Sequence, residues 1–125
     1  MGRIMVVDDS RTIRMSMEYL LKGEGYEVCS AEDGVDGLQK LKEQIAAHKK
    51  PDLIITDINM PNMGGLEFIR KVKGEISTKF IPVLILTTES QESMKMEGKQ
   101  AGAAGWIVKP YRPEQLIAVV KRFIK

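Results

Sequence analysis

Cysteine and histidine are almost absent from this chain of 125 residues, which holds one of each. The lone Cys29 has no partner for an internal disulfide, which fits a reducing compartment and excludes a disulfide-stapled fold. We expect Cys29 to be a buried residue of a strand. His48 stands beside two lysines at a predicted helix end, so we interpret it as a solvated residue and not as a ligand.

The sequence also lacks a long hydrophobic run and an excess of charge of one sign. No segment approaches the roughly 20 apolar residues that cross a bilayer, and the first residues show no small-residue cleavage site, so we expect neither a membrane span nor a secretory signal. The net charge of +2 comes from 19 basic and 17 acidic residues, which disfavours direct nucleic-acid binding. We therefore expect a cytoplasmic protein.

What the chain does contain is a regular alternation of strand and helix patterns, which predicts one domain over residues 1–125. The apolar runs are short and mostly unalternating, as in a parallel sheet covered by helices on both faces. Alternation of this kind predicts a (βα)5 doubly wound α/β fold, whose ligands bind at the carboxyl ends of the strands. The predicted strands are 4–7, 26–29, 53–55, 83–86 and 106–108, and the predicted helices follow Ser10, cover 35–45 and 66–72, lie within 90–102 and begin at Pro113.

Polar side chains stand at the carboxyl ends of four of these strands. Asp8 and Asp9 follow the first strand, Asp57 the third, Thr87 the fourth and Lys109 the fifth. Three neighbouring carboxylates repel each other unless a cation or proton lies between them, and hard oxygen ligands with room for phosphate suit Mg²⁺. An ammonium and a hydroxyl beside them complete the groups that phosphoryl transfer needs.

Asp57 is the best candidate for the attacking carboxylate, because it ends the central, most buried run and precedes a loop rich in glycine and proline. A carboxylate in this role forms an aspartyl phosphate. Any one of these residues could instead be a turn former or a helix cap. Their joint placement at one edge of the predicted sheet favours a chemical site.

Four separated motifs resemble those of response-regulator receiver domains in two-component signalling, and in particular the stand-alone chemotaxis receivers. They are residues 6–10, 55–61, 86–89 and 101–110, and the resemblance covers essentially the whole chain. It implies a flavodoxin-like parallel five-stranded sheet of order 2-1-3-4-5, in a single receiver domain without an output domain.

The same resemblance implies roles for individual residues. Asp57 would be the phosphoacceptor, and Mg²⁺ would be held by Asp8, Asp9, Asp57 and the backbone carbonyl of Asn59. Thr87 and Lys109 would hold the phosphoryl oxygens. The Lys109-Pro110 bond is expected to be cis, which an X-Pro bond permits at a cost of about 0.5–1 kcal/mol.

Receivers of this kind also switch, and Thr87 and Trp106 occupy the switch positions. Phosphorylation would draw Thr87 towards the phosphate and turn the side chain at position 106 inwards. That movement changes the face made by residues 90–102, the strand at 106–108 and the final helix. The weakly apolar segment 90–102 agrees with such a role, although Trp106 also fits simple strand packing. Trp106, Gly64 and Thr88 depart from the residues that are commoner in the family.

The resemblance implies a histidine kinase as phosphodonor, a downstream partner such as a flagellar motor component or another effector, and possible dephosphorylation by a phosphatase. We expect a monomer that acts only on its own Asp57 and is not an enzyme for outside substrates. One alternative is a Mg²⁺-dependent aspartate-nucleophile phosphatase, but that class carries a second Asp where this chain has Asn59. The other is a receiver fragment of a longer response regulator.

Overall fold

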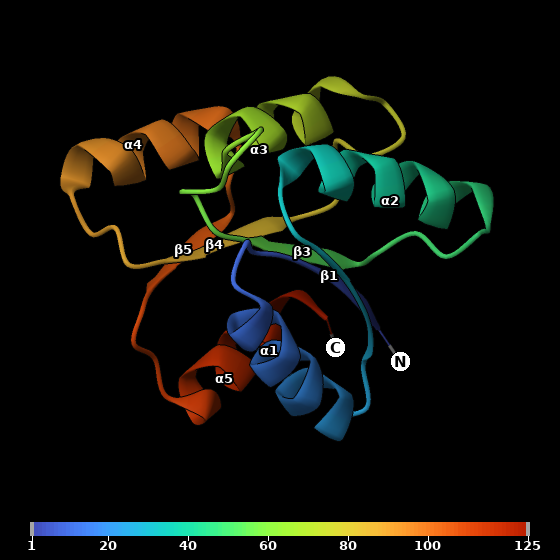
Figure 1. Ribbon diagram of the computed structural model, residues 1–125, viewed down its shortest axis with the longest axis horizontal. Coiled ribbons are helices and arrows are strands. Elements are labelled where there is room, and N and C mark those ends of the chain that lie inside the picture. The colour runs from blue at the N-terminus through green and yellow to red at the C-terminus, as the bar shows by residue number, and fades with distance from the viewer. Residues whose placement is uncertain (1, 125) are drawn as a thin grey trace.

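Within residues 2–124, which the computed structural model describes, five strands alternate with five helices (Figure 1). All strand pairs are parallel, and the order across the sheet is β2-β1-β3-β4-β5. The predicted doubly wound fold and its strand order are therefore confirmed. The elements are β1 (Arg3–Val7), α1 (Arg11–Gly23), β2 (Glu27–Ala31), α2 (Gly34–Ala46), β3 (Leu53–Thr56), α3 (Gly65–Gly74), β4 (Val83–Thr87), α4 (Glu92–Ala101), β5 (Gly105–Val108) and α5 (Pro113–Phe123).

Helices cover both faces of the sheet, with α1 and α5 on one face and α2, α3 and α4 on the other (Figure 1). Alternate residues of β1 enter the two resulting cores: Ile4 and Val6 pack on the α1/α5 side, and Met5 and Val7 pack on the opposite side. All residues of β3 and β4 are buried. Burial on both faces explains why these strands read as continuous apolar runs.

The edge strand β2 is where the sequence prediction is least accurate. We predicted a strand over 26–29, whereas the structure pairs Glu27–Ala31 with β1 and leaves the buried Tyr26 just before the strand. An edge strand pairs with only one neighbouring strand, and the residues of β2 are mostly only partly buried, so its apolar pattern is weaker. For the same reason Cys29 is only partly buried, contrary to expectation, although that burial still raises the pKa of its thiol.

Side-chain caps set the beginnings of α1 and α2. The Ser10 hydroxyl accepts a hydrogen bond from the backbone N–H of Ile13 at 3.2 Å, as its position before the helix predicts. Asp33 does the same for Asp36 at 2.8 Å, which starts α2 at Gly34. Both caps lie at the carboxyl edge of the sheet, so they also fix the loops that carry the polar residues.

Helix α4 forms as predicted within residues 90–102, and Gly98 and Ala101 are its buried residues. Gly98 lies against Trp106 of β5, and a Cβ atom added there would come within 2.8 Å of the indole ring. A glycine that is unfavourable for helix formation is thus explained by the approach of a tryptophan.

No helix in the described part of the chain combines the length and apolarity that crossing a membrane requires.

Candidate phosphoacceptor and metal site

Three carboxylates come together at the carboxyl edge of the sheet. Asp8 and Asp9 follow β1 and Asp57 follows β3, and one oxygen from each lies within 4.8 Å of the others. Backbone hydrogen bonds extend the sheet into this cluster, because Asp57 N–H donates to Val7 at 3.0 Å and Asp8 N–H donates to Ala31 at 3.1 Å. The backbone hydrogen bonds of the sheet therefore fix the main-chain positions of Asp8 and Asp57.

Each buried or half-buried carboxylate has one oxygen held by the backbone and one shared with a lysine. Asp8 Oδ1 accepts from Ser10 N–H at 2.9 Å, and Asp57 Oδ1 accepts from Ile58 N–H at 2.6 Å. The remaining oxygens face Lys109 Nζ, at 3.0 Å from Asp8 and 3.2 Å from Asp57. Lys109 thus bridges two residues that are distant in sequence, as the strand-end pattern predicted.

The charge of Lys109 is well defined by its surroundings. Burial by itself lowers the pKa of the ammonium, but the hydrogen bond and charge of Asp8, together with Asp57, outweigh burial and raise that pKa above its ordinary value. The lysine is therefore a cation at neutral pH. One ammonium beside three carboxylates still leaves excess negative charge, and a hard divalent cation is the group that such an oxygen cluster fits.

Thr87 ends β4 beneath the next loop, with its side chain fully buried. Its hydroxyl oxygen accepts from Glu89 N–H at 3.3 Å, and the carbonyl of Thr87 accepts from Lys109 N–H at 2.7 Å. These contacts join the end of β4 to the residue that bridges the carboxylates. A small movement of Thr87 would therefore shift both Lys109 in the carboxylate cluster and Glu89 in the β4–α4 loop.

Trp106 lies outside the carboxylate cluster. Its indole Nε1–H donates to the Glu89 carbonyl at 3.1 Å, while the ring packs against Gly98 and the Ile85 side of the sheet. Strand packing and a contact with the β4–α4 loop therefore coexist in one residue. An indole can donate but cannot accept a hydrogen bond, so its partner here has to be an acceptor.

Residues 58–64 connect Asp57 to α3, and we call them the acceptor loop. Gly65 N–H donates to the Ile58 carbonyl at 2.8 Å, and a Cβ atom on Gly65 would lie 2.1 Å from the Asp57 carbonyl oxygen. Only glycine permits this close return of the chain. Asn59 is exposed on the loop, and its carbonyl as a metal ligand stays a prediction. The Lys109-Pro110 bond is cis, as expected.

Two residues near the site escaped the sequence analysis. Asp33, which caps α2, also accepts a hydrogen bond at 2.7 Å from the amide of Asn62 in the acceptor loop. An Asp before the glycine at a helix start is a recognisable cap signal, but its second partner lies 29 residues away in sequence. No local pattern predicts that contact.

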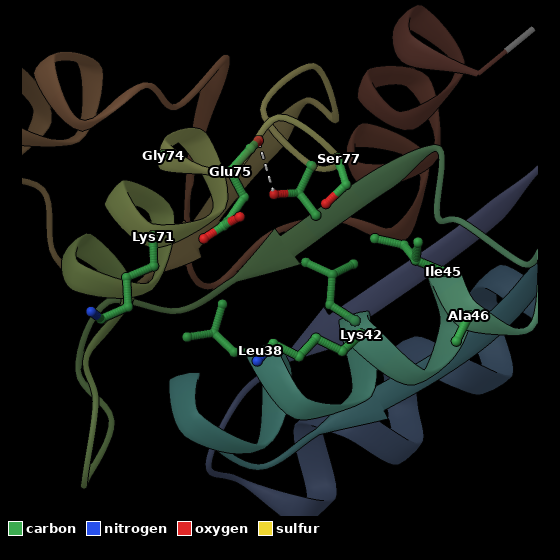
Figure 2. Close-up of a pocket in the computed structure, with 10 residues that line it drawn as sticks. Leu38, Lys42, Ile45, Ala46, Lys71, Gly74, Glu75 and Ser77 are labelled. Atoms are coloured by element: carbon green, nitrogen blue, oxygen red, sulfur yellow. Dashed lines mark hydrogen bonds between the residues drawn. The ribbon is translucent and has the colours of Figure 1, made fainter.

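A groove lies elsewhere on the described chain, between α2 and α3 (Figure 2). Its volume is about 740 Å³, and none of the carboxylates, Thr87 or Lys109 lines it. The groove is therefore separate from the acidic cluster at the carboxyl edge of the sheet. The groove is lined by Leu38, Leu41, Lys42, Ile45, Ala46, Lys71, Gly74, Glu75, Ser77 and Thr78.

Comparison with known proteins agrees with this arrangement. The family model of the response regulator receiver domain matches residues 4–121. The protein PilH of Pseudomonas aeruginosa is 37% identical over 120 residues, 96% of this chain and 95% of PilH. Chemotaxis protein CheY1 of Helicobacter pylori is 38% identical over 115 residues, 91% of this chain and 90% of CheY1.

A solved structure extends the likeness to three dimensions. Chemotaxis protein CheY4 of Vibrio cholerae superposes with a TM-score of 0.89 at 43% identity, and 99% of each chain is covered. The chain belongs to the response regulator receiver domain family and is CheY-like, which confirms the resemblance seen in its motifs. Receivers of this family are signalling modules of two-component systems.

Proposed function

We propose that this receiver accepts a phosphoryl group on Asp57 from a histidine kinase, with Mg²⁺, and transmits the signal through a protein partner. The observation that carries the proposal is the bridge from Asp8 through Lys109 to Asp57, with contacts of 3.0 and 3.2 Å, beside the exposed Asp9. Such a cluster brings together a carboxylate nucleophile, further oxygen ligands and a positive charge for phosphoryl oxygens.

Each side chain has a definite task in the transfer. A lone pair of an Asp57 carboxylate oxygen forms the new oxygen–phosphorus bond. The nitrogen–phosphorus bond of the kinase phosphohistidine breaks, and its electron pair stays on the imidazole. Asp8, Asp9, Asp57 and the Asn59 carbonyl would hold Mg²⁺, which when bound supplies positive charge against the phosphoryl oxygens.

Lys109 and Thr87 act on the product. The Lys109 ammonium, already between two carboxylates, pairs with a phosphoryl oxygen once Asp57 carries the phosphoryl group as an acyl phosphate. The Thr87 hydroxyl, which accepts from Glu89 N–H in this state, has its own proton to donate to another phosphoryl oxygen. Both groups come from the ends of neighbouring strands, so the sheet itself keeps them near the acceptor.

The readout follows from the contacts of Glu89. Movement of Thr87 towards phosphate disturbs the Glu89 backbone, and Trp106 is bonded to the carbonyl of that same residue. The surface of α4, β5 and α5 then changes its affinity for a partner. We propose a cytoplasmic, monomeric receiver that controls a flagellar motor component or a related effector, since similar chains are chemotaxis proteins.

Phosphoryl acceptance is tested with acetyl phosphate as donor and Mg²⁺ as cofactor. We expect a mass increase of one phosphoryl group in the wild type and none in Asp57→Asn. Asp52→Asn is the matched control, because Asp52 precedes the same strand at its opposite end and contacts Arg3 N–H at 2.9 Å. Labelling of Asp57→Asn would refute the assignment, and steady phosphate release from an unrelated phosphomonoester would favour a phosphatase.

A further inference from the structure

The turn between β2 and α2 makes two hydrogen bonds to the acceptor loop. Asn62 Nδ2–H donates to Asp33 Oδ2 at 2.7 Å, and Gly34 N–H donates to the Met63 carbonyl at 3.1 Å. The two partners in the loop are consecutive, and so are the two partners in the turn. The loop is therefore anchored to a neighbouring helix start as well as to its own strand.

Asp33 both caps α2 and accepts the hydrogen bond from the acceptor loop. The residue is only 4% exposed, and its other oxygen caps α2 by accepting from Asp36 N–H at 2.8 Å. Capping needs a single oxygen, so the second oxygen is available for Asn62. The backbone N–H of Asp36 and then the Asn62 amide lower the pKa of Asp33, which keeps it an ionised acceptor.

The loop side of the contact is equally specific. Asn62 has φ of 66°, a left-handed conformation that asparagine tolerates better than most residues. Gly34 lets the two backbones approach, because a Cβ atom there would lie 2.9 Å from the Met63 carbonyl oxygen. Both features favour the loop conformation in which these bonds form.

We propose that Asp33 and Asn62 are positioning residues for the Mg²⁺ site, holding the acceptor loop in its ligand-bearing shape before the ion arrives. The inference rests on the proposed function, in which the Asn59 carbonyl on this loop is a ligand. Asn59 is exposed and stands two residues after Asp57 and three before Asn62. Fixing the loop at both ends limits where its carbonyl can point. Partners that orient metal ligands affect affinity about 10–100-fold without touching the metal.

Reversing the polarity of the bond separates positioning from mere stability. Asn62→Gly keeps the left-handed backbone but removes the donor. Asn62→Asp keeps the length of the side chain but sets a carboxylate against the Asp33 carboxylate. In the double variant Asp33→Asn/Asn62→Asp, the amide introduced at position 33 donates to the carboxylate introduced at position 62, and its oxygen still caps α2. Mg²⁺ affinity is measured by calorimetry, beside the unfolding midpoint in urea without Mg²⁺.

We expect each of Asn62→Gly and Asn62→Asp to weaken Mg²⁺ binding about tenfold, and the double variant Asp33→Asn/Asn62→Asp to recover most of the loss seen in Asn62→Asp. Asp33→Asn alone should bind Mg²⁺ nearly as well as the wild type, because the Asn62 amide can turn its oxygen towards the amide introduced at position 33. Asp36→Asn is the control, since Asp36 accepts from Glu32 N–H in the same turn without contacting the loop. Its Mg²⁺ affinity should match that of the wild type.

Two results would overturn the inference. One is an unchanged Mg²⁺ affinity in Asn62→Gly, and the other is a double variant that binds Mg²⁺ no better than Asn62→Asp, which would reduce Asp33 to a helix cap. Failure of the proposed function looks different, because then the wild type itself would bind no Mg²⁺, or Asp57→Asn would bind it equally well.

Discussion

Helices α3 and α4 lie side by side on one face of the sheet, yet they are held very differently (Figure 1). Helix α3 sends Phe68, Ile69 and Val72 into the core, all of them fully buried. Helix α4, of the same length, buries Gly98 and Ala101, which offer little apolar surface. The helix that follows Asp57 thus has a large buried apolar face, and the helix that follows Thr87 has a small one.

This difference suits the switch that we propose, in which Asp57 accepts the phosphoryl group and α4 reports it. The acceptor must keep its geometry whether or not phosphate is present, so its loop runs into a helix with a large buried face. The helix that reports the event has to move at a small energetic cost, and segments with few buried apolar contacts open most easily. Acceptance and readout can therefore use neighbouring strands without sharing the same rigidity.

The largest effect should come from removing the main anchor of α3. Phe68 is 0% exposed and its ring lies against Gly37 of α2, so Phe68→Ala should lower the free energy of unfolding by about 3–5 kcal/mol. The matched change on α4 is Met96→Ala at an exposed position, with an expected effect within about 0.5 kcal/mol. Urea unfolding measures both, and equal losses would contradict the contrast between the two helices.

A smaller loss of stability is expected when Lys109, which lies between Asp8 and Asp57, is replaced. Without Mg²⁺, Lys109→Met leaves Asp8 and Asp57 without their shared cation, which should cost about 2 kcal/mol at neutral pH. Added Mg²⁺ should recover part of this loss. Lys121→Met removes an exposed pair with Glu24 and should cost less than about 1 kcal/mol.

The pH dependence of the same variant gives an independent measurement. The folded pKa of Lys109 is raised above its ordinary value of 10.5, so its stabilising contribution is complete below that value. The contribution disappears as the pH rises through the folded pKa. On the alkaline side, the stability gap between wild type and Lys109→Met should therefore close only above about pH 10.5. A gap that closed between pH 7 and about pH 9 would exclude the ammonium as its source.

The sequence predicted the sheet and the residues that meet at its edge because both follow from patterns along single strands. Continuous apolar runs identified β1, β3 and β4, and parallel topology then required Asp8, Asp57 and Lys109 to converge. The edge strand β2 was shifted, because partial burial weakens its pattern. Long-range side-chain pairs were also missed.

Gly98 shows why such pairs escape prediction. In the sequence, Gly98 is only a residue that is unfavourable in a helix. The structure shows that it leaves room for the indole ring of Trp106, which belongs to β5. The Asp33–Asn62 bond is hidden in the same way, because each partner alone is an ordinary cap or turn residue. Tertiary contacts between separate elements have no local signature along the chain.

The smallest effect, and the most informative for the readout, is expected from Gly98→Ala. Alanine is favoured over glycine in a helix by about 1 kcal/mol, but the new methyl group lies 2.8 Å from the Trp106 ring and 2.9 Å from Ile85. Overpacking typically costs about 1–3 kcal/mol, so we expect a net loss near 1 kcal/mol. The tryptophan emission should shift to the red as the indole leaves Gly98 and loses its bond to Glu89.

Gly23→Ala is the matched control, because Gly23 ends α1 and a Cβ atom there meets nothing within 4 Å. That variant should be as stable as the wild type or slightly more so, with unchanged emission. If Gly98→Ala instead gained stability with unchanged emission, glycine at this position would not be needed for the tryptophan. The small buried face of α4 would then be a property of the helix alone. The predicted shift would instead link it to Trp106, which contacts the β4–α4 loop.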